Sequence, residues 1–579
     1  MTTTQPGRPT PAGVGRRTVV ATGAAGLGSA TLGGRAAALP SSPSPTPSSR
    51  EAAAAARHRV FQHGVASGDP LPGAVVLWTR VTPTPAARPG SGRGPRTEVR
   101  WEVATDRGFR TVVRRGTFVT SAGRDHTVKL DATGLRPATW YFYRFTAVGQ
   151  RSRVGRTRTA PATDASPRNL RFGVVSCANY QAGWFSAYRH LARRDDLHAV
   201  LHLGDYLYEY EAGYYGAGDV IVRRHEPTGE IVSLDDYRQR HAQYKTDPDL
   251  QDLHARAPFI TVWDDHETAN DTWSGGAENH TPGSGPGGEG GWRRRRARAH
   301  RAYDEWMPVR LDGTARLGDG TRLHRRLRFG TLAELSMLDL RTHRSRQVAV
   351  PAVDPAVSDP DRTITGREQM RWLKASLSRD TAQWKLVGNP VMIAPVTFAA
   401  LPADLVGPVD DVTGLLPRDG LPYNVDQWDG YTDDRRELFA HIRDRGIKDT
   451  VFLTGDIHSG WASDLPFDRG LYPLASETAG VELVCSSVTS DNLKDILGVP
   501  PRTASVAVER VILAANPHIK YLDFDSHGYS VLDVTPARVQ MDWYVIGSRL
   551  DRDTPATWSR SFATRAGTNK VVAVDRPVA

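Results

Sequence analysis

The sequence has few cysteines and no long apolar run in its main part. Only two of its 579 residues are cysteines, Cys177 and Cys485, so a disulfide framework is excluded. Beyond the N-terminal segment no stretch of about 20 apolar residues occurs, and we expect no membrane span. The Gly-x-Ser-x-Gly turn of many serine hydrolases is also absent, which argues against that class of enzyme.

Positive charge is in excess but is not gathered in one stripe. The 74 Lys and Arg residues outnumber the 64 Asp and Glu residues, for a formal net charge of +10. Arg-rich stretches recur beside Asp-rich ones, so we expect a cationic surface that favours anionic ligands, and no nucleic-acid-binding domain. Residues 293–296, four arginines flanked by Trp292 and Trp306, predict a basic helix that is either a solvated face or a surface for phosphate-rich partners.

The N-terminal segment has the outline of a twin-arginine signal. Arg16 and Arg17 precede an Ala- and Gly-rich run that ends in a small-residue triplet at residues 36–38. We predict a signal peptide over residues 1–38, a Ser/Pro-rich linker over 39–58, and a secreted or cell-wall-associated protein exported by the twin-arginine translocation machinery. Gly15 departs from the usual pattern, and an atypical basic N-terminus is the alternative.

Residues 59–162 predict a small β-sandwich. Short apolar runs at 74–78 and 140–145 and the alternating Val99, Trp101 and Val103 are typical of strands with one buried face. The turn at residues 131–135 and Pro137 resemble a corner of fibronectin-like sandwiches.

Residues 168–579 predict an α/β domain, because apolar runs alternate with helical patterns. Polar residues follow each predicted strand, and such residues converge at the carboxyl edge of an open α/β sheet, where ligands bind. The strands and the residues that end them are 170–175 with Cys177, 199–203 with Asp205, 259–263 with Asp265, 384–387 with Asn389, and 450–453 with Asp456. The Gly- and Pro-rich segment 274–291 predicts a surface loop, a candidate lid.

The residue types at these strand ends are those of metal ligands. A carboxylate such as Asp205 can bridge two cations, and a phenolate such as that of Tyr208 binds a strongly Lewis-acidic cation such as ferric iron. Three carboxylates and one imidazole crowd into residues 264–267 and would repel one another if buried without a cation. Asp456 and His458 flank one residue, so in an extended segment they share a face. Alternatively, Tyr208 belongs to an alternating tyrosine strand face.

The order Gly-Asp-x-x-Tyr, Asp-His-Glu and Gly-Asp-x-His resembles the calcineurin-like metallophosphoesterases. Asp265 and Asp456 stand where that superfamily has Asn and His, and Cys177 stands in place of its early Asp-x-His. These departures and residues 61–69, 176–180, 202–209 and 453–458 resemble the PhoD-type alkaline phosphatases over nearly the whole chain. The resemblance implies a four-layer α/β/β/α metallophosphoesterase domain after a fibronectin-like sandwich.

The resemblance also implies one ferric ion and two calcium ions. It makes Cys177, Asp205, Tyr208 and His458 iron ligands and Asp265 and Asp456 calcium ligands. A disulfide between Cys177 and Cys485 is the alternative for the cysteine.

Three further residues are candidates for the site. Asn389 is either a further ligand or part of an Asx turn. His266 is a candidate to protonate the leaving group or stabilise the transition state. Arg341 either clamps phosphate oxygens or pairs with Asp339.

The resulting hypothesis is a monomeric alkaline phosphatase or phosphodiesterase that attacks phosphate esters with a metal-activated hydroxide. An alternative on the same scaffold is a phosphodiesterase acting on phospholipids, like phospholipase D, or on teichoic-acid-like polymers. A third hypothesis is a polyanion-binding surface protein without turnover, against which the clustered aspartates argue.

Overall fold

The computed structural model describes residues 58–578 except 217–219, 314–321, 350–353 and 398–421. The predicted signal peptide and residues 39–57 of the linker lie outside the described residues. Residues His58–Ala579 form one compact unit. Within the described part of the chain no helix is long and apolar enough to cross a membrane.

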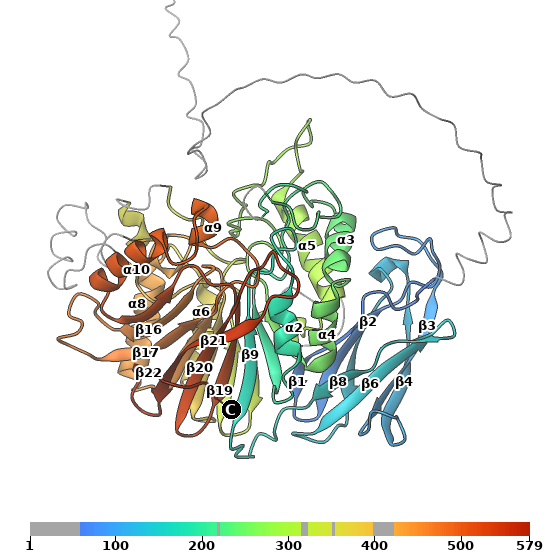
Figure 1. Cartoon of the computed structure of the whole chain (residues 1–579), viewed down its shortest axis with the longest axis horizontal. Coiled ribbons are helices and arrows are strands. Elements are labelled where there is room, and N and C mark those ends of the chain that lie inside the picture. Colours follow the sequence, from blue (N-terminus) through green and yellow to red (C-terminus); the bar gives the residue numbers. More distant parts are fainter. Residues whose placement is uncertain (1–57, 217–219, 314–321, 350–353, 398–421, 579) are drawn as a thin grey trace, which may run out of the picture. The chain divides into compact units, whose positions relative to one another are not determined.

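The predicted N-terminal sandwich is present, and one of its layers continues into the next domain (Figure 1). Its outer layer is a five-stranded sheet, and its inner layer is the edge of a ten-stranded sheet. The strands of the outer layer are β3 (Thr97–Ala104), β4 (Val112–Thr120), β6 (Trp140–Ala147), β7 (Gln150–Arg151) and β8 (Gly155–Arg158). Those of the inner layer are β1 (Val65–Leu71), β2 (Ala74–Arg80) and β5 (Thr127–Thr133).

The connection between the two predicted domains is a strand pair. β1 pairs in parallel with β11 (Phe259–Val262), with Gly68 opposite Phe259. A Cβ on Gly68 would lie 2.0 Å from the carbonyl oxygen of Pro308, so only glycine fits this approach. The predicted domain boundary near residues 162–168 stays a prediction. Strands from both sides of this boundary are hydrogen-bonded in one sheet, since β1 precedes it and β11 follows it.

Two large sheets form the centre of the catalytic part. The ten-stranded sheet has the order β22-β21-β20-β19-β9-β10-β11-β1-β2-β5, and the seven-stranded sheet has the order β12-β13-β14-β15-β17-β16-β18. In the first sheet the remaining strands are β9 (Leu170–Val175), β10 (Ala199–Leu203), β19 (Gly528–Val534), β20 (Arg538–Ile546), β21 (Ala556–Arg565) and β22 (Val571–Val574). The second consists of β12 (Arg325–Phe329), β13 (Ala333–Met337), β14 (Trp384–Asn389), β15 (Thr450–Thr454), β16 (Gly460–Pro466), β17 (Thr478–Val484) and β18 (Ile519–Asp523).

The sheets pack face to face, with helices outside them. Val451 and Leu453 of β15 point into the core shared with the first sheet, whereas Phe452 points into the core beneath the outer helices, as strand alternation requires. Phe172 of β9 meets Phe329 of β12 edge-on, with ring centroids 5.3 Å apart. These contacts confirm the predicted α/β/β/α layering.

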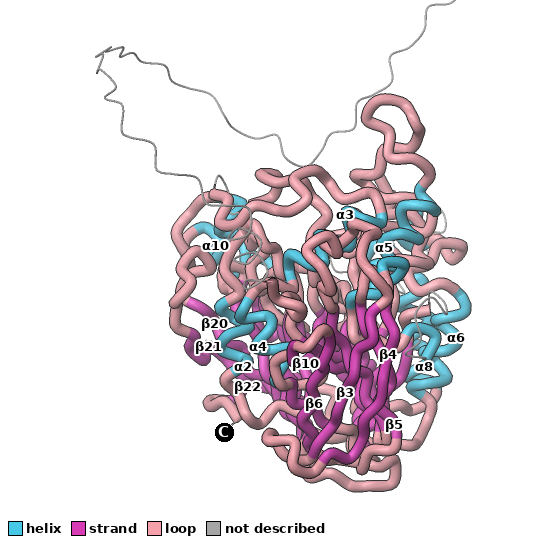
Figure 2. The backbone as a smooth tube through the Cα atoms, turned by 90° about the vertical axis from the view of Figure 1, so that its right-hand side faces the viewer, coloured by secondary structure: helices cyan, strands magenta, loops and turns pink. Residues whose placement is uncertain are grey.

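The helices divide between the two outer layers (Figures 1 and 2). The first layer contains α2 (Ser186–Ala192), α3 (Leu234–Tyr244), α4 (Pro248–Arg256) and α5 (Trp292–Trp306). The second contains α6 (Arg367–Leu377), α8 (Thr432–Asp444) and α10 (Ala504–Ala515), with the short α9 (Leu493–Leu497) nearby. Figure 2 shows the long loops gathered at one end of the sheets.

Candidate metal centre

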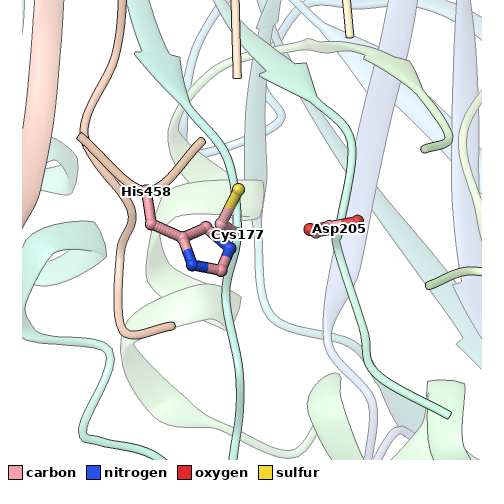
Figure 3. A group of neighbouring side chains, drawn as sticks. All are labelled: Cys177, Asp205 and His458. Atoms are coloured by element: carbon pink, nitrogen blue, oxygen red, sulfur yellow. The ribbon is translucent and has the colours of Figure 1, made fainter. Parts of the chain in front are cut away.

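Three side chains that are far apart in the sequence meet beyond the strand ends. Cys177 follows β9, Asp205 follows β10, and His458 lies in the loop after β15 (Figure 3). One ligand atom from each of the three lies within 4.8 Å of the others. Cys177 and Asp205 are buried and His458 is nearly so. A thiolate, a carboxylate and an imidazole at this spacing can hold one transition-metal ion.

Two more groups of potential ligands adjoin the first. Asp205, Asp265 and His266 form one group, and Asp264, Asp265 and Asp456 form the other, again with ligand atoms within 4.8 Å. Asp205 belongs to the first two groups and Asp265 to the last two. The three groups are therefore contiguous, as in a centre that holds several cations with shared carboxylates.

The backbone at these positions is in the left-handed region. Cys177, Asp205, Asp456 and His458 have φ values of 58°, 53°, 64° and 57°. Non-glycine residues adopt this conformation at a cost, and such residues cluster at functional sites. Gly204, with φ of 105°, lets the chain turn before Asp205, and a Cβ there would lie 2.5 Å from Cβ of Asp264.

Tyr208 completes the first group. Its hydroxyl donates to Oδ2 of Asp205 at 2.9 Å, accepts from Ser490 at 2.6 Å and lies 3.4 Å from Nε2 of His458. Nδ1 of His458 lies 2.6 Å from the carbonyl oxygen of Asp491 and donates to it, which leaves Nε2 facing the group. Metal-binding histidines are typically oriented in this way by a hydrogen bond from the second ring nitrogen.

Unsatisfied buried oxygens show that the site fits cations. Oδ1 of Asp205 and Oδ1 of Asp265 are buried and have no hydrogen-bond partner among the described residues. Burial raises the pKa of Asp205 and of Asp264 well above the usual range, and it raises the pKa of Asp456 to about 6. Burial and the nearby Asp205 also raise the pKa of the Cys177 thiol. A cation stabilises the ionised form of all four groups.

Arg341 lies among the carboxylates. Its guanidinium contacts Asp264 at 2.5 Å, Asp426 at 2.8 Å and Asp456 at 3.3 Å. Only its backbone N–H bonds Asp339, so the predicted side-chain pairing with Asp339 is not the observed one. The role of Arg341 as a phosphate clamp stays a prediction, although its charge lies beside the candidate ligands.

His266 is held by an acidic partner. Nδ1 of His266 lies 2.8 Å from Oε2 of Glu209, and its ring centroid is 4.1 Å from that of Tyr208. Burial alone would lower the pKa of His266, but the charges of Asp265, Glu209 and Asp205 raise it well above the usual range. A raised pKa favours the protonated imidazole, the form that an acid catalyst requires.

Asn389 lies at the end of β14, as predicted, but its amide is engaged. Its side-chain oxygen accepts from the indole of Trp428 at 3.0 Å, and its amide nitrogen donates to the carbonyl oxygen of Val391 at 2.6 Å and to Thr454 at 3.2 Å. None of these three contacts is that of an Asx turn. A ligand role for Asn389 stays a prediction.

The two cysteines are buried and free. Each sulfur atom is hydrogen-bonded to Ser176, at 3.2 Å for Cys177 and 3.3 Å for Cys485. The alternative of a disulfide between them is thus not what the structure shows, and Cys177 is available as a ligand.

Sequence reasoning did not foresee how several residues support the site. Glu267 accepts backbone N–H bonds from Asp205 and Tyr206, at 3.2 and 2.6 Å, and from Asp264 at 2.8 Å, which joins the loops after β10 and β11. Its place beside Asp265 and His266 in the sequence was a usable signal. Asp426 and Ser490 come from distant loops and carry no motif.

A two-sheet α/β/β/α fold with clustered ligands at the strand ends defines a metallophosphoesterase-like hydrolase. The chain belongs to the PhoD-like phosphatase family: residues 172–543 match PhoD-like phosphatase, and residues 46–161 match PhoD-like phosphatase, N-terminal domain. It is therefore a phosphoric ester hydrolase, a homologue of alkaline phosphatase D.

Two known proteins show the relationship in detail. Alkaline phosphatase D of Bacillus subtilis (strain 168) is 36% identical over 489 residues, which cover 84% of this chain and 77% of the relative. A solved structure of PhoD superposes with a TM-score of 0.78 and 33% identity, covering 90% of this chain and 93% of its own.

Proposed function

We propose that this protein is an exported alkaline phosphatase and phosphodiesterase that hydrolyses phosphate esters with the help of bound cations. The observation that carries the proposal is the row of three contiguous ligand groups joined by Asp205 and Asp265. Buried carboxylates at this density are stable only with compensating positive charge, and Arg341 supplies only part of it.

The donor atoms suggest which cations are held. We assign Cys177, Asp205, Tyr208 and His458 to one ferric ion, because a phenolate donor favours a strongly Lewis-acidic cation. We assign Asp265 and Asp456 to two calcium ions, because oxygen donors favour hard cations. Bound by these residues, the cations would lower the pKa of a water molecule and would neutralise charge on the phosphate group.

The remaining tasks fall to the chain itself. His266, held by Glu209, donates a proton to the oxygen of the leaving group. Arg341, held beside Asp264 and Asp456, offers its guanidinium to phosphate oxygens as the substrate enters. Glu267 fixes the loops that carry Asp205 and Asp265, so the donor groups are oriented before substrate binds.

Metal analysis of the purified, secreted protein tests this scheme. We expect iron and calcium together, and we expect Asp205→Ala to lose metal and phosphatase activity together, because Asp205 belongs to two ligand groups. The exposed Asp380→Ala serves as a control and should keep both. Full activity of Asp205→Ala with iron still bound would overturn the scheme, and zinc alone would overturn the metal assignment.

A parallel assay separates the ester classes. The same preparation is tested on a phosphomonoester, a phosphodiester and phosphatidylcholine. Hydrolysis of the first two supports the function proposed here, whereas turnover of phosphatidylcholine alone favours the phospholipase-like alternative.

Export is tested separately from catalysis. Replacing both Arg16 and Arg17 by Lys should keep the activity inside the cell, because the paired arginines are the recognised feature of the signal. Unchanged activity in the culture medium would remove the twin-arginine route from the proposal.

A further inference from the structure

The outward face of the five-stranded sheet carries arginines in register. Arg100 of β3 lies opposite Thr117 of β4 and Thr146 of β6, and Thr146 lies opposite Arg151 of β7. The cross-strand spacing is roughly 5 Å, and alternate residues of one strand are roughly 7 Å apart. The row therefore carries Arg100 and Arg151 two strand spacings apart, roughly 10 Å, with the hydroxyl of Thr146 between them.

The next row of this face continues the pattern. Glu102 of β3 lies opposite Arg115 of β4 on one side and Arg144 of β6 on the other. Glu102 accepts from Arg144 at 2.8 Å, so one carboxylate holds one of the two guanidinium groups. Arg115 remains exposed.

Three arginines of this face have no acidic partner. Among the described residues Arg100, Arg115 and Arg151 make no side-chain hydrogen bond or ion pair, and all three are exposed. By contrast, buried arginines such as Arg325 and Arg341 are paired with aspartates. The charges of these three arginines are therefore available to an anion, whereas Arg144 is paired with Glu102 and the exposed Glu98 lies on the same face.

The face is also hollowed. A cavity of about 400 Å³ opens on it. Gly116, which has no side chain, and Trp101, whose ring packs against the sandwich core, also line the cavity. The guanidinium groups provide planar, bidentate donors and Thr117 and Thr146 provide hydroxyls, a donor set suited to phosphate oxygens.

Further cations extend the surface along β8. Arg156 and Arg158 of β8 lie opposite Phe142 and Trp140 of β6. Arg156 stacks on the Trp140 ring, with its guanidinium carbon 3.5 Å from the centroid. Burial, with contributions from the like charges of Arg256 and Arg158, lowers the pKa of Arg156 to about 10. Arg156 also lies 3.8 Å from the carboxylate of Asp195, which compensates part of its charge. A ligand on this face would still meet several cations close together.

The aromatic residues argue for a polymer without bases. Single-stranded nucleic acids gain much of their affinity by stacking bases on free aromatic rings. Here Arg156 already covers Trp140, and Arg144 covers Phe109 at 4.0 Å. What the face offers is charge and hydroxyl donors.

We propose that the outward face of the five-stranded sheet binds linear phosphate polymers and holds them as substrates on the chain that hydrolyses them. The binding step stands on the sheet face alone, whereas the substrate role rests on the proposed function. Capture of a polymer by this face raises the local concentration of its ester groups without any change at the metal centre.

Binding is tested with the full chain and inorganic polyphosphate in the presence of a chelator, which suppresses turnover. The double variant Arg100→Gln/Arg151→Gln should bind polyphosphate roughly 10- to 100-fold more weakly, and the slope of log K against log salt should fall by about 2, one unit for each lost phosphate contact. The matched control is Arg371→Gln/Arg379→Gln, which removes the same charge from one exposed position in α6 and one just after it and should bind like the wild type.

Competing anions test which polymer the face takes. Weak binding of polyglutamate and of single-stranded DNA relative to polyphosphate supports the proposal. Tighter binding of the DNA would overturn it in favour of a nucleic-acid site, and equal binding of polyglutamate would overturn phosphate recognition. An unchanged affinity of the Arg100/Arg151 variant would also overturn it.

Kinetics separate this inference from the proposed function. The Arg100/Arg151 variant should raise KM for a phosphodiester polymer at least fivefold while leaving kcat, and KM for a small monoester, unchanged. Equal KM values of variant and wild type on the polymer would overturn the substrate role. If the wild type hydrolyses no phosphate ester at all, the proposed function fails, and the binding measurement still decides the site on the sheet.

Discussion

At the scale of single residues, the site depends on partners that are not ligands. Glu209 holds Nδ1 of His266 at 2.8 Å and also accepts from the backbone of Asn270 and from the amide of Asn279. Glu267 performs the same positioning task for the loop that carries Asp205. Such partners orient the reacting groups, and their loss reduces activity even though they contact no substrate.

Glu209→Gln should lower kcat roughly 10- to 100-fold with little change in KM, because an amide can still hold His266 but no longer bears charge. Since the Glu209 carboxylate raises the pKa of His266, its loss lowers that pKa, and the decline of kcat with rising pH should begin at lower pH. The pH profile of kcat measures this. The exposed Glu211→Gln is the control, and a profile of Glu209→Gln that matches the wild type argues against the positioning role.

The two cysteines provide a matched pair of substitutions. Cys177→Ser should lose bound iron and activity, because it removes a soft donor from the first ligand group, whereas Cys485→Ser should keep both. Iron content per chain is the measurement. Equal iron in the two variants would exclude Cys177 as a ligand.

At the scale of helices and strands, the sequence predicted most of what positions the site. The runs at 170–175 and 199–203 are β9 and β10 as observed, since continuous apolar stretches bounded by polar residues are typical of buried parallel strands. The neighbours of these strands were not predictable in the same way. β19, from near the C-terminus, pairs antiparallel with β9, and this contact depends on packing across the whole chain.

The turns after the strands were predicted only in part. Gly204 can adopt its own positive φ readily, but nothing in the residue type of Cys177 predicts the positive φ found there. Asp426 reaches Arg341 from a loop without a motif. These features arise from tertiary contacts that over-determine the local backbone.

Gly204→Ala should destabilise the protein by roughly 1–3 kcal/mol and reduce its metal content, because the new Cβ meets Asp264 and the backbone at φ of 105° is unfavourable for alanine. Gly149→Ala is the control: it has φ of 70° but nothing within 4 Å of a new Cβ, so only the backbone cost applies. Apparent melting temperatures report the difference. An equal loss at the two positions would show that contact with Asp264 is unimportant.

At the scale of the whole molecule, buried charge makes stability depend on pH. Lys245 is buried, and its ammonium donates a hydrogen bond to the hydroxyl of Tyr206 at 2.9 Å. Burial lowers the pKa of Lys245 to about 7. Between pH 7 and about 10.4 the unfolded chain therefore binds a proton at this residue that the folded chain lacks, so stability rises with pH across this window.

Lys245→Met should remove this contribution, because methionine fills a similar volume without charge. Its melting temperature should exceed that of the wild type at pH 7, and the advantage should shrink as the pH rises toward 10. The exposed Lys448→Met controls for loss of a lysine in general and should follow the wild type. If the melting temperatures of Lys245→Met and the wild type differed by the same amount at every pH, the effect would come from packing and not from protonation.

The pairing of β1 with β11 has a consequence for how this protein can be divided. A cut between the sandwich and the catalytic part would expose two unpaired strand edges, one on each fragment, and such edges recruit other chains. The sandwich is therefore not a separate domain joined only by a flexible linker, because a strand pair connects it to the catalytic part. A chimera that exchanges the sandwich must therefore also supply a strand edge that pairs with β11.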